Sequence, residues 1–110
     1  MPDARYLEFI HLFNNEHFYE AHEVLEELWL QTSGDRKTFY KGLIQCAVAL
    51  AHWQRKNPRG MIQVGERAMN ALKLFNSETE GILLQELLND FEAFLASPGS
   101  NFPRIQTTRN

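Results

Sequence analysis

Two apolar segments of this chain, residues 18–29 and 39–53, carry polar side chains where a plain core helix would carry aliphatic ones. The first segment contains His22 and Glu26, and the second contains Gln45 and His52. Imidazole gains or loses a proton near neutral pH, so it can serve as a general base, a metal ligand or an anion-binding group. Carboxylate and amide groups can orient an imidazole or bind the same ligand. These residue types indicate a place for chemistry rather than one particular reaction.

The spacing within each segment predicts that these polar groups meet. His22 and Glu26 are four residues apart, so they are adjacent on a helix surface. Gln45 and His52 are seven residues apart and project in nearly the same direction, with the small Ala49 between them. If the two helices pack side by side, the four groups converge on one point. An unpartnered buried polar group costs about 1–3 kcal/mol, so converging groups either satisfy one another or bind a ligand.

Two hypotheses of different class follow, and the first is a binding or catalytic pocket in which one of the histidines is the general base or ligand. Its candidate residues are His22, Glu23, Glu26, Gln45 and His52, with Tyr19 and Trp29 as an aromatic wall. The ligand would be a small molecule or a divalent metal. The candidate metal ligands are His22, Glu26 and His52, because two imidazoles and a carboxylate suit zinc or a similar ion. Whether such a pocket catalyses a reaction stays open.

The second hypothesis is a non-enzymatic interaction module in which the polar cluster only fixes how the helices pack. In this interpretation the protein associates with itself as a homo-oligomer. Eight Phe, three Tyr and two Trp are many aromatic residues for a chain of 110, and some could remain for an interface. Trp53 and Phe102 are the aromatic residues that we expect to be exposed and to make the contact.

The elements that must position these residues are helices, because helical periodicity covers nearly the whole chain and no segment alternates strictly as a half-buried strand does. The sequence therefore predicts an all-α fold, a compact antiparallel bundle of about five helices. We expect a single helical domain over residues 1–96 and an extended tail over residues 97–110, which contains proline and glycine. The expected helices cover residues 3–14, 17–31, 35–56 and 58–75, and the capping-box spacing of residues 77–80 predicts the start of a fifth.

Individual residues predict how these elements begin and end. Gly34 is expected to end the second helix in a left-handed conformation, and Asp35 to cap the third helix. Pro58 suits the first position of the fourth helix, because proline lacks only an N–H that would be unpaired there. In the tail, Phe102 and Ile105 are the residues expected to pin the chain to the domain.

Composition excludes several classes of partner. The chain has 11 basic and 14 acidic residues, a net charge of −3, and its basic residues are scattered. Nucleic acid is therefore not an expected partner, because phosphate binding needs clustered Lys and Arg. No membrane association is expected either, since the longest strongly apolar run, residues 46–51, is far too short to span a bilayer and no signal segment is visible. The single Cys46 has no partner for an internal disulfide, which favours a reducing, cytoplasmic location.

Two motifs, taken together, resemble the domain of unknown function three-zero-nine family of small prokaryotic proteins, over about residues 9–72. The motifs are Phe13-Asn14 with the run 19–29, and the run 42–45 with His52. The resemblance implies a compact, intracellular, all-α domain and brings no established activity. Carried over position by position, it points to His22, Glu23, Glu26, Trp29, Gln45 and His52, and to a basic turn at residues 55–60. Relatives often have a glycine between the first two helices, where Asn15 is here expected to take the left-handed conformation.

Overall fold

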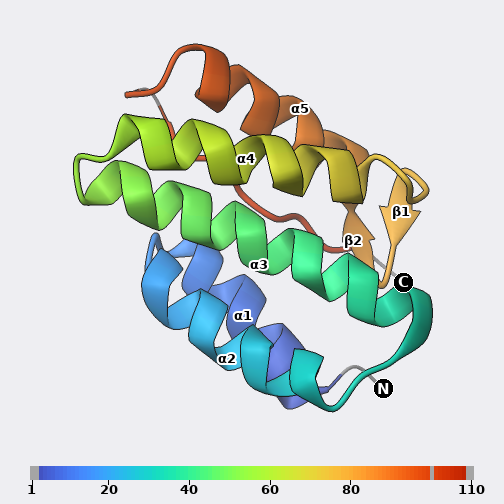
Figure 1. Ribbon diagram of the computed structural model, residues 1–110. Coiled ribbons are helices and arrows are strands. Elements are labelled where there is room, and N and C mark those ends of the chain that lie inside the picture. Colours follow the sequence, from blue (N-terminus) through green and yellow to red (C-terminus); the bar gives the residue numbers. More distant parts are fainter. Residues whose placement is uncertain (1–2, 100, 109–110) are drawn as a thin grey trace.

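Five α-helices and one short hairpin make up the part of the chain that the computed structural model describes, residues 3–99 and 101–108 (Figure 1). The helices are α1 (Ala4–Asn14), α2 (Phe18–Leu30), α3 (Gly34–Gln54), α4 (Pro58–Leu72) and α5 (Leu84–Ala96). The hairpin consists of β1 (Glu78–Thr79) and β2 (Ile82–Leu83), which pair in antiparallel fashion. The all-α prediction is confirmed, and the first four helices begin and end within three residues of the expected bounds.

Short polar side chains start α1 and α4. The Asp3 carboxylate accepts a hydrogen bond of 2.8 Å from the Arg5 N–H, which satisfies one of the unpaired amides at the start of α1. Asn57 does the same for α4, because its side-chain oxygen accepts a hydrogen bond of 3.1 Å from the Gly60 N–H. Pro58 occupies the first turn of α4, as predicted.

The start of α3 differs in part from the prediction. Gly34 has the expected left-handed conformation, with a φ of +73°, but it does not end α2, because α2 ends at Leu30 with Gln31 as its C-cap and Gly34 is the first residue of α3. Asp35 does not cap α3, because it already lies inside the first turn, and the N-cap position belongs to Ser33. The Ser33 side chain makes no capping hydrogen bond. The central helix of the fold therefore begins without a side-chain cap.

Helix α3 lies at the centre of the bundle, with α1 and α2 on one side and α4 and α5 on the other (Figure 1). Small residues on α3 let its neighbours come close. A Cβ atom added to Gly42 would lie only 2.6 Å from Cδ2 of Leu72 on α4. Cys46 is fully buried in the same helix, and this burial raises the pKa of its thiol. Cys46 is therefore an apolar core residue, as expected, and not a nucleophile.

Residues 78–83 form the hairpin, so the prediction that residues 77–80 cap the fifth helix is wrong. Thr79 pairs with Ile82 across a two-residue turn, in which Glu80 and Gly81 have φ values of +49° and +77°. Two successive left-handed residues, with glycine in second place, are typical of the tightest hairpin turns. The buried Ile82 side chain holds β2 against the core, and α5 starts only at Leu84.

The residue with the left-handed conformation between α1 and α2 is Glu16. The prediction that Asn15 takes this conformation is wrong. Glu16 has a left-handed φ of +65°, whereas φ of Asn15 is −98°. Asn15 completes α1, because both its backbone N–H and its side-chain amide donate to the carbonyl of His11. The residue after it must then take the left-handed conformation.

In Figure 1 the tail emerges from behind α4 and runs in the gap between α4 and α3 towards β2, and Phe102 and Ile105 pack into the core. The Phe102 ring lies between those of Phe18 and Phe94, with centroid distances of 5.1 and 5.0 Å. Ile105 is buried, and Thr107 forms a single antiparallel bridge to β2. The non-helical tail is thus held by Phe102 and Ile105, as expected.

Candidate functional site

A small pocket lies between α2 and α3. Its volume is about 150 Å³, and its walls are Tyr19, His22, Val48, Ala51, His52 and Arg55. The first two residues come from the start of α2, and the other four from the end of α3 and its C-cap. The two helices pack side by side in opposite directions, so the start of one lies beside the end of the other (Figure 1). This packing brings His22 and His52 to one pocket.

A hydrogen bond determines which nitrogen of His22 carries the proton. Its Nδ1 atom lies 2.6 Å from the carbonyl oxygen of Tyr19. A carbonyl can only accept, so Nδ1 is the protonated nitrogen and Nε2 of the neutral ring is an acceptor. This Nε2 has no hydrogen-bond partner within residues 3–99 and 101–108. His22 can therefore accept a proton or bind a donor through Nε2.

His52 has the opposite arrangement. The Asn57 side-chain oxygen accepts a hydrogen bond from the Gly60 N–H, which turns the amide nitrogen of Asn57 toward His52 Nδ1 at 3.2 Å. Because that amide nitrogen donates, Nδ1 of His52 accepts and the proton of the neutral ring lies on Nε2. A Cβ atom on Gly60 would lie 3.0 Å from the same ring, so the turn into α4 packs closely against it. His52 thus offers an N–H donor.

Arg55 supplies the positive charge of the pocket. Its guanidinium carbon lies 4.6 Å from the centroid of the Tyr19 ring, a favourable cation–π distance. The same ring packs edge-on against His22, with a centroid distance of 4.9 Å. Tyr19 is 44% exposed, so this stack reaches the surface. Val48 and Ala51 add apolar wall beside it.

The remaining polar candidates do not line this pocket. Glu23 and Glu26 are exposed on α2, and Gln45 is half-buried on α3 two turns before His52. Glu26 lies one turn of α2 beyond His22, a displacement of about 6 Å along the helix axis. In the described part of the chain no three His, Cys, Asp or Glu side chains are grouped so as to hold a metal ion. The candidate ligand set of His22, Glu26 and His52 is therefore not assembled.

Trp29 lies elsewhere and is covered by lysine. The Nζ atoms of Lys37 and Lys41 lie 4.6 and 4.9 Å from the Trp29 ring. Of the two aromatic residues expected to form a wall, only Tyr19 lines the pocket.

The aromatic residues expected to be exposed are half-buried instead. The Trp53 ring packs edge-on against Phe94 at 6.1 Å, and Phe102 fills the space beside the same ring. Both side chains therefore contribute to the core and not to a free surface. The large apolar side chains that the structure exposes are Leu7, Tyr19, Leu30, Ile62 and Leu74.

Arg55 and Asn57 were not predicted as site residues. The chain offered a signal for Arg55, because it follows His52 by three residues and so lies on the same face if the helix continues. Asn57 was identified only as part of the basic turn at residues 55–60, to which the resemblance points. Its contact with His52 depends on the conformation of the turn, in which Lys56 adopts a left-handed φ of +63°.

The fold and the pocket define a class of protein, an all-α domain whose central helix and preceding helix enclose a pocket with two histidines. None of its described helices is long and apolar enough to cross a membrane. The chain belongs to the family described as Domain of unknown function (DUF309), whose model matches residues 6–64. The resemblance seen in the motifs is therefore confirmed.

Two bacterial relatives support this membership. An uncharacterised protein of Aquifex aeolicus (strain VF5) is 34% identical over 86 residues, which cover 77% of this chain and 26% of that protein. The uncharacterised protein YpuF of Bacillus subtilis (strain 168) is 33% identical over 92 residues, which cover 82% of this chain and 49% of that protein. The chain thus spans about a quarter of the first relative and about half of the second.

Proposed function

We propose that this domain binds a small hydroxylated carboxylic acid in the pocket between α2 and α3. The observation that carries the proposal is that His22, His52 and Arg55 line one pocket of about 150 Å³. One water molecule takes up about 30 Å³ of the liquid, so the pocket admits a ligand of about five water-sized groups. This size suits a short organic acid and excludes a nucleotide.

The hydrogen-bonding capacity of the pocket supports this class of ligand. The Arg55 guanidinium and the Nε2–H of His52 are donors that suit a carboxylate. Nε2 of His22 is an acceptor that suits a hydroxyl. Val48, Ala51 and the Tyr19 ring leave an apolar wall for a short hydrocarbon chain.

Isothermal titration calorimetry with lactate and propionate tests the proposal. Lactate is expected to bind. Propionate is expected to bind at least fivefold more weakly, because it lacks the hydroxyl group that would donate a hydrogen bond to Nε2 of His22. Arg55→Gln and His22→Phe are each expected to weaken lactate binding at least tenfold. His17→Ala is the matched control, because His17 is exposed at the N-cap of α2 and lies outside the pocket. Lactate binding that is absent, or that is equal in all these variants, overturns the proposal.

The alternative is a module in which the histidines only fix helix packing. The contacts of His52 with Asn57 and Gly60 favour it, since they hold the ring as a structural residue. Melting temperatures separate the two. A pocket maintained for binding is expected to cost stability, so His22→Phe should preserve or raise the melting temperature. A drop of several degrees, together with a dimeric mass at micromolar concentration, supports the module.

We further propose a cytoplasmic location, because the buried reduced Cys46 suits a reducing compartment. Fractionation of cells that express the protein tests it, and recovery in an oxidising compartment contradicts it.

A further inference from the structure

A second and larger hollow lies at the opposite end of α3. Its volume is about 1010 Å³, and it is formed by the start of α1, the end of α2, the start of α3 and the hairpin turn. It shares no lining residue with the histidine pocket. The residues that matter for its chemistry are Asp3, Ser33, Arg36, Tyr40 and Glu80. A hollow of this volume is in the range of sites for small molecules.

Tyr40 points to a ligand in this groove. Its side chain is nearly fully buried, with 5% exposed, yet its hydroxyl makes no hydrogen bond to residues 3–99 and 101–108. No buried side-chain oxygen or nitrogen of these residues is left unpaired, so the hydroxyl is reached by solvent, through the groove that Tyr40 lines. Burial and, next, the Glu80 carboxylate raise the pKa of Tyr40. The hydroxyl therefore stays protonated and is a donor.

The start of α3 supplies further donors, about 9 Å from Tyr40 along the helix axis. Ser33, the N-cap residue, makes no side-chain capping bond. Within the described residues, no side chain therefore accepts a hydrogen bond from the first amides of this 21-residue helix. These amides also form the positive end of the helix dipole. Arg36 stands in the same turn, and its Nε lies 3.2 Å from Oε1 of Glu80. This end of the groove therefore suits a carboxylate.

Glu80 supplies the opposite charge. The Tyr6 hydroxyl donates to the Glu80 backbone carbonyl at 2.8 Å, which holds the hairpin turn over the groove. Only Oε1 of the Glu80 side chain is paired, so Oε2 can accept a hydrogen bond from a ligand. Glu80 therefore suits an ammonium group placed beside its ion pair with Arg36.

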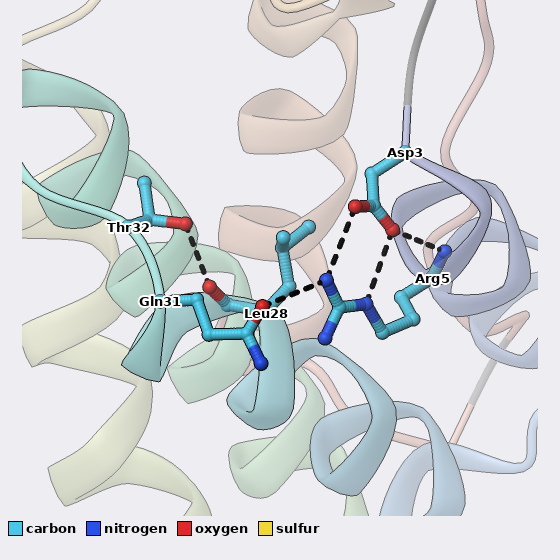
Figure 2. A network of polar contacts seen from close by, with 5 residues as sticks. All are labelled: Asp3, Arg5, Leu28, Gln31 and Thr32. Atoms are coloured by element: carbon cyan, nitrogen blue, oxygen red, sulfur yellow. Dashed lines mark hydrogen bonds and ion pairs between the residues drawn. The ribbon is translucent and has the colours of Figure 1, made fainter.

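The other carboxylate of the groove is already occupied. Figure 2 shows the Arg5 guanidinium between Asp3 and the Gln31 amide, with distances of 3.2 Å to each oxygen of Asp3 and 3.1 Å to Oε1 of Gln31. The hydrogen bonds from Arg5 lower the pKa of Asp3, so this pair stays charged. In the same figure the Thr32 hydroxyl donates to the Leu28 carbonyl. This rim is therefore fixed, and the carboxylate oxygen left for a ligand belongs to Glu80.

The charges around the groove balance, because Arg5 pairs with Asp3 and Arg36 pairs with Glu80. A simple anion would meet Glu80 and a simple cation would meet Arg36, whereas a molecule with both charges can satisfy both partners of this ion pair. We infer that this groove binds a small zwitterion, with its carboxylate at the start of α3 and its ammonium at Glu80. A free amino acid and a short peptide share this chemistry, and the 3.2 Å contact between Arg36 and Glu80 favours the amino acid, whose two charges are also close together.

Calorimetry with triglycine, glycine, acetate and methylammonium tests the inference. Triglycine or glycine is expected to bind at least fivefold more tightly than either single-charge probe. The tighter of the two shows whether the groove takes a short peptide or a free amino acid. Tyr40→Phe and Glu80→Gln are each expected to weaken that binding at least fivefold while the circular dichroism spectrum is unchanged. Arg36→Gln is a third variant with the same expectation, in case one of the others fails to fold.

Two controls complete the experiment. Asp35→Asn changes an exposed carboxylate in the first turn of α3 that does not line the groove, and His22→Phe changes the separate pocket. Both are expected to leave zwitterion binding unchanged. Acetate that binds as tightly as glycine reveals a simple anion site and overturns the inference, as does the absence of binding by either zwitterion. Because the probes differ from lactate, a failure here is distinguishable from a failure of the histidine pocket.

Discussion

The side-chain amide of Asn14 makes hydrogen bonds to both backbone groups of Ile105. Its Nδ2 donates to the Ile105 carbonyl at 2.8 Å, and its Oδ1 accepts from the Ile105 N–H at 2.7 Å. The two bonds imitate one step of strand pairing and join the end of α1 to the tail. They hold Ile105 in the core at a point where the tail has no regular partner.

Asn14→Ala is therefore expected to destabilise the domain by about 2 kcal/mol, because two partly buried backbone groups lose their partners. Urea unfolding followed by circular dichroism measures this change. Asn70→Ala, at an exposed position of α4, is the control and is expected to change stability by less than about 0.5 kcal/mol. Equal effects of the two substitutions would show that the link to the tail adds nothing to stability.

Glu16→Gly is expected to stabilise the domain by about 0.5–1 kcal/mol. A side chain in the left-handed conformation costs about 1–2 kcal/mol, and the greater freedom of glycine in the unfolded chain offsets part of the gain. Asn15→Gly is the control, since φ of Asn15 is negative and the substitution also removes its bond to the His11 carbonyl. Thermal unfolding compares the two, and a lower melting temperature for Glu16→Gly contradicts the prediction.

Gly42→Ala is expected to destabilise the domain by about 1–3 kcal/mol, because the new methyl group overlaps Leu72 where α3 crosses α4. The cost depends on one neighbouring side chain, so it can be relieved there. Leu72→Val in the same chain is expected to recover part of the loss, which a double-mutant cycle detects as coupling between the sites. Strictly additive effects would place the cause of the destabilisation elsewhere.

Alkaline pH is expected to destabilise the domain through Tyr6. Burial, followed by the nearby Tyr40 and Glu80 charges, raises the pKa of Tyr6 above its usual value near 10. Above about pH 10 the unfolded chain then releases a proton that the folded chain retains, so the free energy of unfolding falls as pH rises.

Tyr6→Phe tests this linkage. It removes the hydrogen bond to Glu80 and is expected to lower stability at neutral pH by about 1 kcal/mol. It also removes a titrating group, so the decline between pH 9 and 11 is expected to be shallower by up to about 1.4 kcal/mol per pH unit. Urea unfolding at several pH values measures both effects, and parallel pH profiles for the two proteins rule out a contribution from Tyr6.

Residues that act within one helix were predictable from the sequence. Helical periodicity predicted α1 to α4, and Pro58 predicted the first turn of α4, because both depend on neighbours along the chain. The hairpin was not predicted from the sequence, because two local signals competed in the same segment. The Glu80-Gly81 turn prevailed over a capping-box spacing, because it allows Ile82 to be buried.

By itself the amino-acid sequence determined the helical character of the chain and placed His22 and His52 on the inner faces of their helices, since both follow from periodicity. Only the tertiary structure decided which polar residues meet. The offset between α2 and α3 places His22 beside Arg55 and leaves Glu26 and Gln45 outside the pocket. The groove around Tyr40 is likewise assembled from four separate segments, whose packing depends on contacts between residues distant in the chain.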